Sequence, residues 1–192
     1  APVPASSTPQ ASATPTEPPQ PTIAPVTVGD IVLSQRFETS DGKITFYYPE
    51  DWFAIELNGG GITVTNDQNV QRTSDAKLTA GQVYMDMFTL TGTELGGVPE
   101  GTTVLEVTTV LVDNISASPD SPFDFSPPVD LTLNDYPAVR TAGTNGVNDL
   151  ILFLVDVGAD TYLAASGNSA LDELSDYEPT LRAILQTLVF AV

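Results

Sequence analysis

The sequence lacks cysteine and histidine altogether. Without cysteine the chain has no thiol nucleophile, disulfide bond or thiolate metal ligand, and without histidine it has no imidazole ligand for zinc or iron. Histidine is also the side chain best suited to proton transfer near neutral pH. These absences remove most common catalytic and transition-metal chemistry, so we expect a protein that is not an enzyme and needs no cofactor.

Basic residues are scarce. Lysine and arginine together number 6, against 25 aspartates and glutamates, and the formal net charge is −19. Such a surface repels the phosphates of nucleic acids and the headgroups of anionic lipids, so we expect neither as a partner. It attracts cations or the basic face of another protein.

Long hydrophobic runs are also missing. The longest candidate extends from Leu150 to Val155 and is bounded by Asp149 and Asp156, whereas a membrane-spanning helix needs about 20 apolar residues. We therefore expect no transmembrane span. The 192 residues, 41% of them hydrophobic, suit one domain with a sizeable core.

Proline is concentrated at the N-terminus. Residues 1–28 hold half of the 16 prolines, many serines and threonines, and one charged residue, Glu17. Proline fixes φ and lacks an N–H, and this segment has too little apolar surface to offset the chain entropy lost on folding. We expect an extended, disordered tether over residues 1–28 and one folded domain over residues 29–192.

The tether resembles the Pro/Ser/Thr-rich spacers that follow the lipidated cysteine of bacterial lipoproteins. The sequence begins at Ala1 rather than at a methionine, which is consistent with a processed mature end. We expect an extracytoplasmic protein, in the periplasm or at the cell surface, and hypothesise a lipid anchor on a residue before Ala1. The alternative is a linker cut from a longer chain.

Short apolar segments separated by Asp, Asn, Gly and Pro predict strands joined by tight turns. In Gln82–Thr91 both faces carry apolar residues, which predicts a central strand covered on both sides. The segments predicted to be extended are Ile31–Thr39, Lys43–Tyr48, Trp52–Leu57, Ile62–Thr65, Gln82–Thr91, Val129–Leu133, Tyr136–Gly143, Asp149–Val157, Thr161–Ala165 and Val189–Val192.

Two helices are predicted. Over residues 102–117, Thr103 and Glu106 form a capping-box pattern ahead of an apolar stripe. The last helix is expected to begin near Pro179, because proline suits the first helical turn. Strands, a helix, antiparallel strands and a terminal helix make an α+β fold with a mainly antiparallel sheet.

Three motifs are Phe46–Trp52 (FYYPEDW), Leu131–Ala138 (LTLNDYPA) and the ending Pro179–Phe190. Together they resemble the PsbP-like superfamily, which includes the photosystem extrinsic subunit PsbP and LpqN/DcrB-type bacterial lipoproteins. The resemblance covers about residues 30–192. It implies an α/β/α sandwich and a binding or assembly role without catalysis. Metal binding in the photosystem member is associated with histidine and is not carried over.

An acidic cluster, Asp172, Glu173, Asp176 and Glu178, is a candidate calcium site, because calcium prefers oxygen ligands. The cluster lacks the spacing of a calcium-binding loop. The alternative is that these acids are solvated and favour the start of the last helix through its dipole. Asp120 and Asp124 are a weaker candidate of the same kind.

The proline-rich segment from Pro119 to Pro128 contains Phe123 and Phe125. Exposed aromatic side chains often dominate the energetics of interfaces, so these two are candidate contacts for a partner. The alternative is that both rings fold back over the sheet.

The composition and the resemblance together predict a non-catalytic accessory protein that is tethered at the membrane and stabilises a larger membrane-associated protein complex. Two alternatives stay open. One is a lipoprotein that binds a small ligand in an apolar pocket between helix and sheet. The other is a calcium-dependent cell-surface module that depends on the acidic residues.

Overall fold

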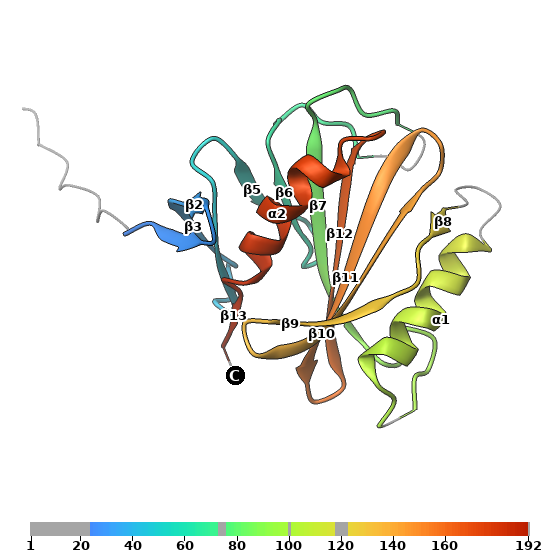
Figure 1. Ribbon diagram of the computed structural model, residues 1–192. Coiled ribbons are helices and arrows are strands. Elements are labelled where there is room, and N and C mark those ends of the chain that lie inside the picture. Colours follow the sequence, from blue (N-terminus) through green and yellow to red (C-terminus); the bar gives the residue numbers. More distant parts are fainter. Residues whose placement is uncertain (1–23, 73–75, 100, 118–122, 192) are drawn as a thin grey trace, which may run out of the picture.

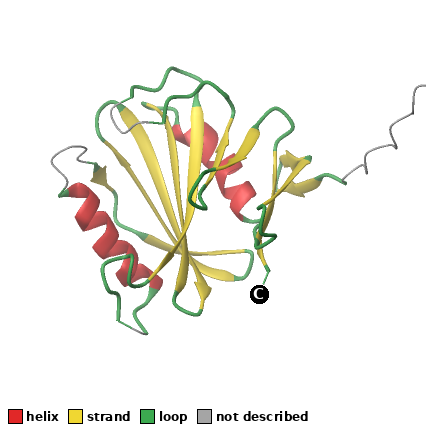
Figure 2. Ribbon diagram, turned by 180° about the vertical axis from the view of Figure 1, so that it is seen from behind, coloured by secondary structure: helices red, strands yellow, loops and turns green. Residues whose placement is uncertain are grey.

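The computed structural model describes residues 24–72, 76–99, 101–117 and 123–191. Within these residues the chain has the predicted α+β fold, with two helices packed on opposite faces of a large antiparallel sheet (Figures 1 and 2). A small sheet lies beside the second helix and over the same face of the large sheet. The predicted tether falls mostly outside the described residues, as do residues 118–122.

The elements have the following bounds. The helices are α1 (Val104–Ser116) and α2 (Leu174–Leu185). The strands are β1 (Val26–Val28), β2 (Ile31–Leu33), β3 (Gln35–Glu38), β4 (Ile44–Tyr48), β5 (Phe53–Glu56), β6 (Ile62–Thr65), β7 (Val83–Thr91), β8 (Asp124–Phe125), β9 (Val129–Leu133), β10 (Tyr136–Thr144), β11 (Asn148–Gly158), β12 (Thr161–Ala170) and β13 (Val189–Phe190).

The large sheet has eight strands in the order β5-β6-β7-β12-β11-β10-β8, and β9 also pairs with β10. The small sheet has the order β13-β4-β3, and β1 and β2 form a separate hairpin. Every pairing is antiparallel. The long hairpins β10–β11 and β11–β12 make β11 and β12 the centre of the large sheet.

Two tight turns explain how this meander closes. Asn134 and Asp135 join β9 to β10 with φ values of 45° and 67°. Ala159 and Asp160 join β11 to β12 with φ values of 52° and 57°. Two consecutive residues with positive φ suit the right-handed twist of paired strands, which is why such turns are common in hairpins. Both turns were predicted from the sequence.

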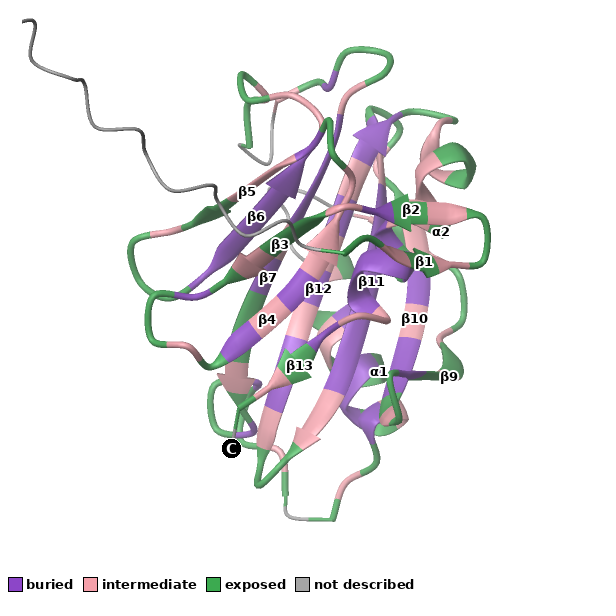
Figure 3. Ribbon diagram, turned by 90° about the vertical axis from the view of Figure 1, so that its left-hand side faces the viewer, coloured by how far each residue is buried: buried purple, intermediate pink, exposed green. Residues whose placement is uncertain are grey.

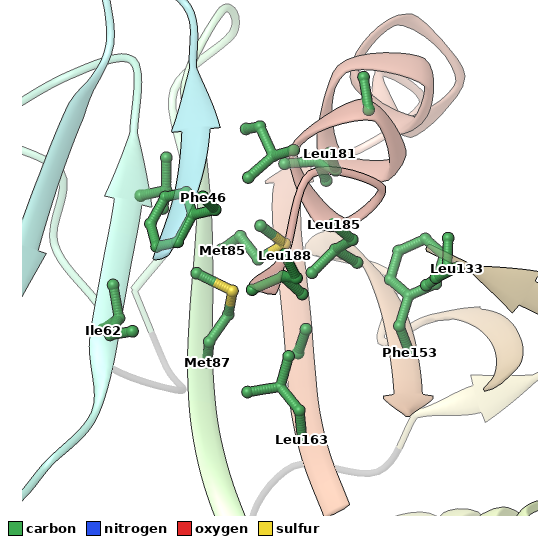
Figure 4. Close-up of a cluster of buried hydrophobic side chains, with 14 of the residues drawn as sticks. Phe46, Ile62, Met85, Met87, Leu133, Phe153, Leu163, Leu181, Leu185 and Leu188 are labelled. Atoms are coloured by element: carbon green, nitrogen blue, oxygen red, sulfur yellow. The ribbon is translucent and has the colours of Figure 1, made fainter. Parts of the chain in front are cut away.

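The main core lies between the large sheet, α2 and the small sheet (Figure 4). Strands β6 and β11 are buried along most of their length (Figure 3). The fully buried side chains include Phe46 from the small sheet, Met85 and Leu163 from the large sheet, and Leu181 from α2. Because side chains alternate along a strand, the other face of the sheet carries a second, smaller core under α1.

Helix α1 confirms its prediction. Its N-cap Thr103 accepts a hydrogen bond from the backbone N–H of Glu106, and the Thr103 backbone N–H donates to Glu106 Oε2 at 2.9 Å. This reciprocal pair satisfies donors that the first helical turn leaves free. The buried Thr108 hydroxyl donates to the Val104 carbonyl at 2.8 Å, so a polar side chain is tolerated in the core.

Helix α2 begins earlier than predicted. It starts at Leu174, after a turn in which Asp172 has φ 67°, and Pro179 lies inside it. Proline has no N–H to donate to the carbonyl of Ser175, four residues earlier. Ser175 and Pro179 are both exposed, so this carbonyl needs no partner from the protein and the helix continues. The prediction of a start near Pro179 was wrong for this reason.

Other boundaries also differ. Val26–Val28 forms β1, although these residues belong to the segment predicted as a tether. The predicted strand Ile31–Thr39 is divided into β2 and β3. Strand β12 continues to Ala170, beyond the predicted end at Ala165. The polar sequence of Ser166–Ser169 did not predict a strand. In the structure Gly167 and Ser169 are buried, and Gly167 lies against Leu181 of α2 and Ile151 of β11.

Gly167 sets how closely α2 approaches the sheet. A Cβ at this position would lie 2.5 Å from Leu181 Cδ1 and 2.8 Å from Ile151 Cγ2. We predict that Gly167→Val lowers the free energy of unfolding by about 2–3 kcal/mol, because overpacking forces these side chains apart. Urea denaturation measures the change. Ser166→Val, on the opposite face of the same strand, is the matched control and should change stability by less than about 0.5 kcal/mol.

Candidate protein-binding surface

Helix α1 covers only part of its face of the large sheet. It packs against β8, β10 and β11, and among the described residues no helix covers the same face of β5, β6 and β7 (Figure 2). The register places Ile55, Thr63, Asp86 and Ser166 in one row across β5, β6, β7 and β12. We call this region the open face and define it by Ile55, Thr63, Asp86, Phe88, Leu90 and Ser166.

Phe88 is the most informative side chain of the open face. A Cβ at Gly61 would lie 2.3 Å from Phe88 Cε1, so the ring lies directly over the backbone of Gly61. An aromatic ring that covers a glycine on the neighbouring strand shields the backbone hydrogen bonds of the sheet. The ring nevertheless stays 41% exposed. One side of the ring therefore has a structural role, and the other is presented to solvent.

Ile55 is the second large apolar side chain that is exposed on this face. It lies on the edge strand β5 and is 47% exposed. Leu90, two residues after Phe88 along β7, is half-buried and packs against the second core under α1, so it marks the covered border of the open face. Apolar side chains gathered on an uncovered sheet face are a common property of protein interfaces. Six other large apolar side chains are exposed elsewhere in the described residues, but Phe88 is the aromatic one among them.

A polar network occupies the centre of the open face. The Thr63 hydroxyl donates to Asp86 Oδ1, Arg72 Nη1 lies 3.3 Å from the same oxygen, and Arg72 also donates to the Thr63 hydroxyl. Thr63 is buried and Asp86 is largely buried. The carboxylate is thus satisfied by its own chain, and the network fastens the loop that carries Arg72 to the sheet.

The loop after β6 closes one end of the open face. Leu78 from this loop packs against Tyr84 and Ala170. The buried Asn148 side chain holds the loop, because it accepts from the Leu78 N–H at 2.9 Å and donates to the Ala76 carbonyl at 2.8 Å. Burial, and then the charge of Asp86, raise the pKa of Tyr84 to about 12. Tyr84 is therefore a neutral structural residue at physiological pH.

Two of the four acids of the predicted calcium site direct their carboxylates to different partners, and a third, Asp172, is held through its backbone N–H. Glu178 pairs with Arg140, whose Nε donates to Glu178 Oε1 at 2.8 Å. Glu173 Oε2 accepts from the Gly81 N–H at 2.8 Å, and the Asp172 N–H donates to Asp149 Oδ2 at 2.8 Å. Across the described part of the chain, no three acidic side chains form a group that would hold a metal ion.

Calcium binding by Asp172, Glu173, Asp176 and Glu178 therefore stays a prediction without support from the geometry. The acidic residue in the first turn of α2 is Asp176, where it is favourable for the helix dipole. Of the weaker pair, Asp124 lies in β8 and Asp120 lies outside the described residues.

Phe123 and Phe125 lie together at the edge of the sheet, with ring centroids 5.8 Å apart. Both are half-buried. Phe125 pairs with Gly143 of β10, where a Cβ would lie 2.8 Å from Phe125 Cδ1. Their role in binding a partner stays a prediction, because each ring is partly covered by the protein and partly exposed to solvent.

The open face was not predicted from the sequence. Apolar residues on both faces of β7 predicted cover on both sides, and at Phe88 this prediction was wrong. Two features of the sequence could have indicated the open face. Asp86 interrupts the apolar pattern of β7, and Gly61, the last residue of the glycine turn, has no side chain. Without the strand order, nothing indicated that Phe88 and Gly61 are neighbours.

No family model and no curated protein matches the sequence. Several solved structures, including the following three, are similar in fold. LpqN of Mycobacterium tuberculosis, described as involved in cell envelope biogenesis, is 15% identical, and the match covers 82% of this chain and 90% of LpqN with a TM-score of 0.53. The cyanobacterial PsbP (CyanoP) of Synechocystis sp. PCC 6803 is 10% identical, with 82% and 92% covered and a TM-score of 0.52.

The third is the Ran-binding protein Mog1p of Saccharomyces cerevisiae, which is 11% identical. That match covers 81% of this chain and 94% of Mog1p, with a TM-score of 0.54. The chain therefore has a PsbP-like fold, as its motifs predicted. At these identities the likeness concerns the fold alone.

The contact between Phe88 and Gly61 is testable by a double-mutant cycle. We predict that Gly61→Ala lowers the free energy of unfolding by about 1 kcal/mol, because the new methyl group displaces the Phe88 ring. In a Phe88→Ala background the same change should be neutral or stabilising, since alanine suits a strand better than glycine. Urea denaturation of the four proteins measures the coupling, and additive effects would show that the ring does not lie over Gly61.

Proposed function

We propose that this protein is a non-catalytic, extracytoplasmic accessory protein that is tethered at the membrane and docks through its open face onto a larger membrane-associated protein complex. The observation that carries the proposal is the exposed ring of Phe88, fixed over Gly61 on a sheet face that α1 leaves uncovered. A rigid, partly exposed aromatic side chain is the kind of anchor that gives interfaces much of their binding energy.

The charge of the chain indicates the chemistry of the partner. Two copies that each carry a net charge of −19 repel one another, which disfavours self-association through the open face. A partner with lysine and arginine around an apolar centre fits better, because its basic rim meets the acidic surface while its centre covers Phe88 and Ile55. Complementary charge also speeds the encounter of the two proteins.

The N-terminal composition supports a tether. Because Val26–Val28 belongs to β1, the tether is at most residues 1–25. Polyproline II structure extends by about 3.1 Å per residue, so a segment of this length reaches at most about 80 Å. Such a spacer lets the domain reach a complex that protrudes from the membrane. None of the helices in the described segments has the length and apolar character that crossing a membrane requires. The anchor that we propose is a lipid on a residue before Ala1, because the Pro/Ser/Thr-rich composition of the segment resembles the spacers of bacterial lipoproteins.

The similar structures favour binding over catalysis. Mog1p is a Ran-binding protein, and LpqN is involved in cell envelope biogenesis. CyanoP is a cyanobacterial PsbP. For this chain, a role in binding or assembly at an extracytoplasmic membrane surface is the proposal that agrees with its fold, its charge and its open face.

The proposal predicts that the full chain co-purifies with a stoichiometric membrane complex from a mild-detergent extract of its own membranes. Phe88→Asp should weaken this binding about thirtyfold or more, because an interface anchor contributes about 2 kcal/mol or more. Quantitative mass spectrometry of the eluted subunits measures the loss.

Val129→Asp is the matched control. Val129 is 55% exposed, lies in β9 of the same sheet, and pairs with Arg140 on the face opposite to the open face. This variant should retain the complex. If the unmodified chain elutes alone, the accessory role is wrong. If both variants retain the complex equally, the accessory role stands and the open face is not the interface.

A further inference from the structure

A cleft of about 430 Å³ opens between the two sheets. Its walls come from the β3–β4 turn and β13 on the side of the small sheet, and from β7 and the β11–β12 hairpin on the side of the large sheet. The turn between β5 and β6 closes one end. The cleft lies on the side of the large sheet that faces the small sheet, so it is separate from the open face.

The floor of the cleft is apolar. Ile44 is 6% exposed and belongs to the main core, and Phe190 packs edge-on against Tyr136 with ring centroids 5.3 Å apart. Val157 adds an aliphatic side chain from the large sheet. A volume of several hundred Å³ with an apolar floor is typical of sites for small organic ligands.

The rim carries two carboxylates that one turn holds in place. Glu56 accepts two hydrogen bonds from Ser40, from its N–H at 2.8 Å and its hydroxyl at 2.9 Å. Asp41 accepts from the Lys43 N–H at 3.1 Å and the Thr39 hydroxyl at 2.8 Å. These hydrogen bonds, led by that from Lys43, lower the pKa of Asp41 to about 2.

The two carboxylates differ in their access to a cation. Lys43 Nζ lies 3.1 Å from Asp41 Oδ2 and balances that charge. No lysine or arginine in the described part of the chain forms an ion pair with Glu56. An ionised carboxylate has about four acceptor sites, so Glu56 keeps acceptor capacity beyond its two bonds to Ser40. The rim therefore has one negative charge in excess.

We propose that this cleft binds a small amphipathic organic cation, with an aryl or alkyl body on the apolar floor and an ammonium group hydrogen-bonded to Glu56. The apolar floor favours the body through burial, and the carboxylate adds a charge-assisted hydrogen bond. An anionic ligand of the same shape is repelled by Glu56 and by the charge of the whole chain. This inference does not depend on the protein complex proposed above.

Three probes of the same shape test the ligand class. They are phenylbutylamine, phenylbutanol and phenylbutyrate, whose polar group at the end of the alkyl chain is positive, neutral and negative, respectively. Titrations of the full chain at fixed ionic strength, followed by amide NMR spectra, should shift the signals of Ile44, Thr89 and Thr161. We expect the amine to bind about tenfold more tightly than the alcohol, and the acid to bind most weakly. Equal affinities, or shifts confined to other parts of the chain, would overturn the proposal.

A pair of variants separates the site from the general negative charge. Glu56→Gln should weaken amine binding about tenfold, to the level of the alcohol, and leave alcohol binding unchanged. Glu50→Gln removes the same charge from an exposed residue in the turn after β4, away from the cleft, and should have no effect. If the two variants weaken amine binding equally, the amine responds only to net charge and the assigned site is wrong.

Discussion

The contact between α2 and the centre of the large sheet is the interaction on which the rest of the structure depends. Leu181 lies over Gly167 of β12 and beside Ile151 of β11, and the absence of a side chain at Gly167 permits this approach. The same core includes Phe46 of the small sheet. Because α2 and the small sheet share one face of the large sheet, α1 is the one helix of the described residues on the other face. It packs mainly on β8, β10 and β11, and its core extends to Tyr162 of β12 and Leu90 of β7. The open face follows from this unequal distribution of cover.

Local sequence patterns predicted the elements well where interactions between residues close in sequence determine the structure. The capping box placed α1, and Ile62–Thr65 and Val129–Leu133 were predicted with the observed bounds. Two errors have tertiary causes. The start of α2 depends on solvent access to the Ser175 carbonyl, and the end of β12 depends on packing around Gly167. Neither is encoded in the periodicity of the segment itself.

The candidate sites were harder to predict than the fold. Glu173, Asp176 and Glu178 are close in sequence, but Glu173 turns to Gly81 and Glu178 turns to Arg140 across the sheet. Residues two positions apart on a helix point in widely different directions, so a run of acids does not converge on one ion. The exposure of Phe88 depends on the strand order. The position of Glu56 at the rim of the cleft depends on contact between the two sheets. Both are properties of long-range pairing.

We propose that the open face contacts a basic protein partner in a membrane complex. The most direct measurement is site-specific photo-cross-linking in intact cells, with benzoylphenylalanine in place of Phe88 and, separately, in place of Val129. The account predicts that the probe at position 88 cross-links to one subunit of a membrane complex, within a segment rich in lysine and arginine, and that the probe at 129 does not. Cross-linking of the same subunit from position 129 but not from 88 would contradict it.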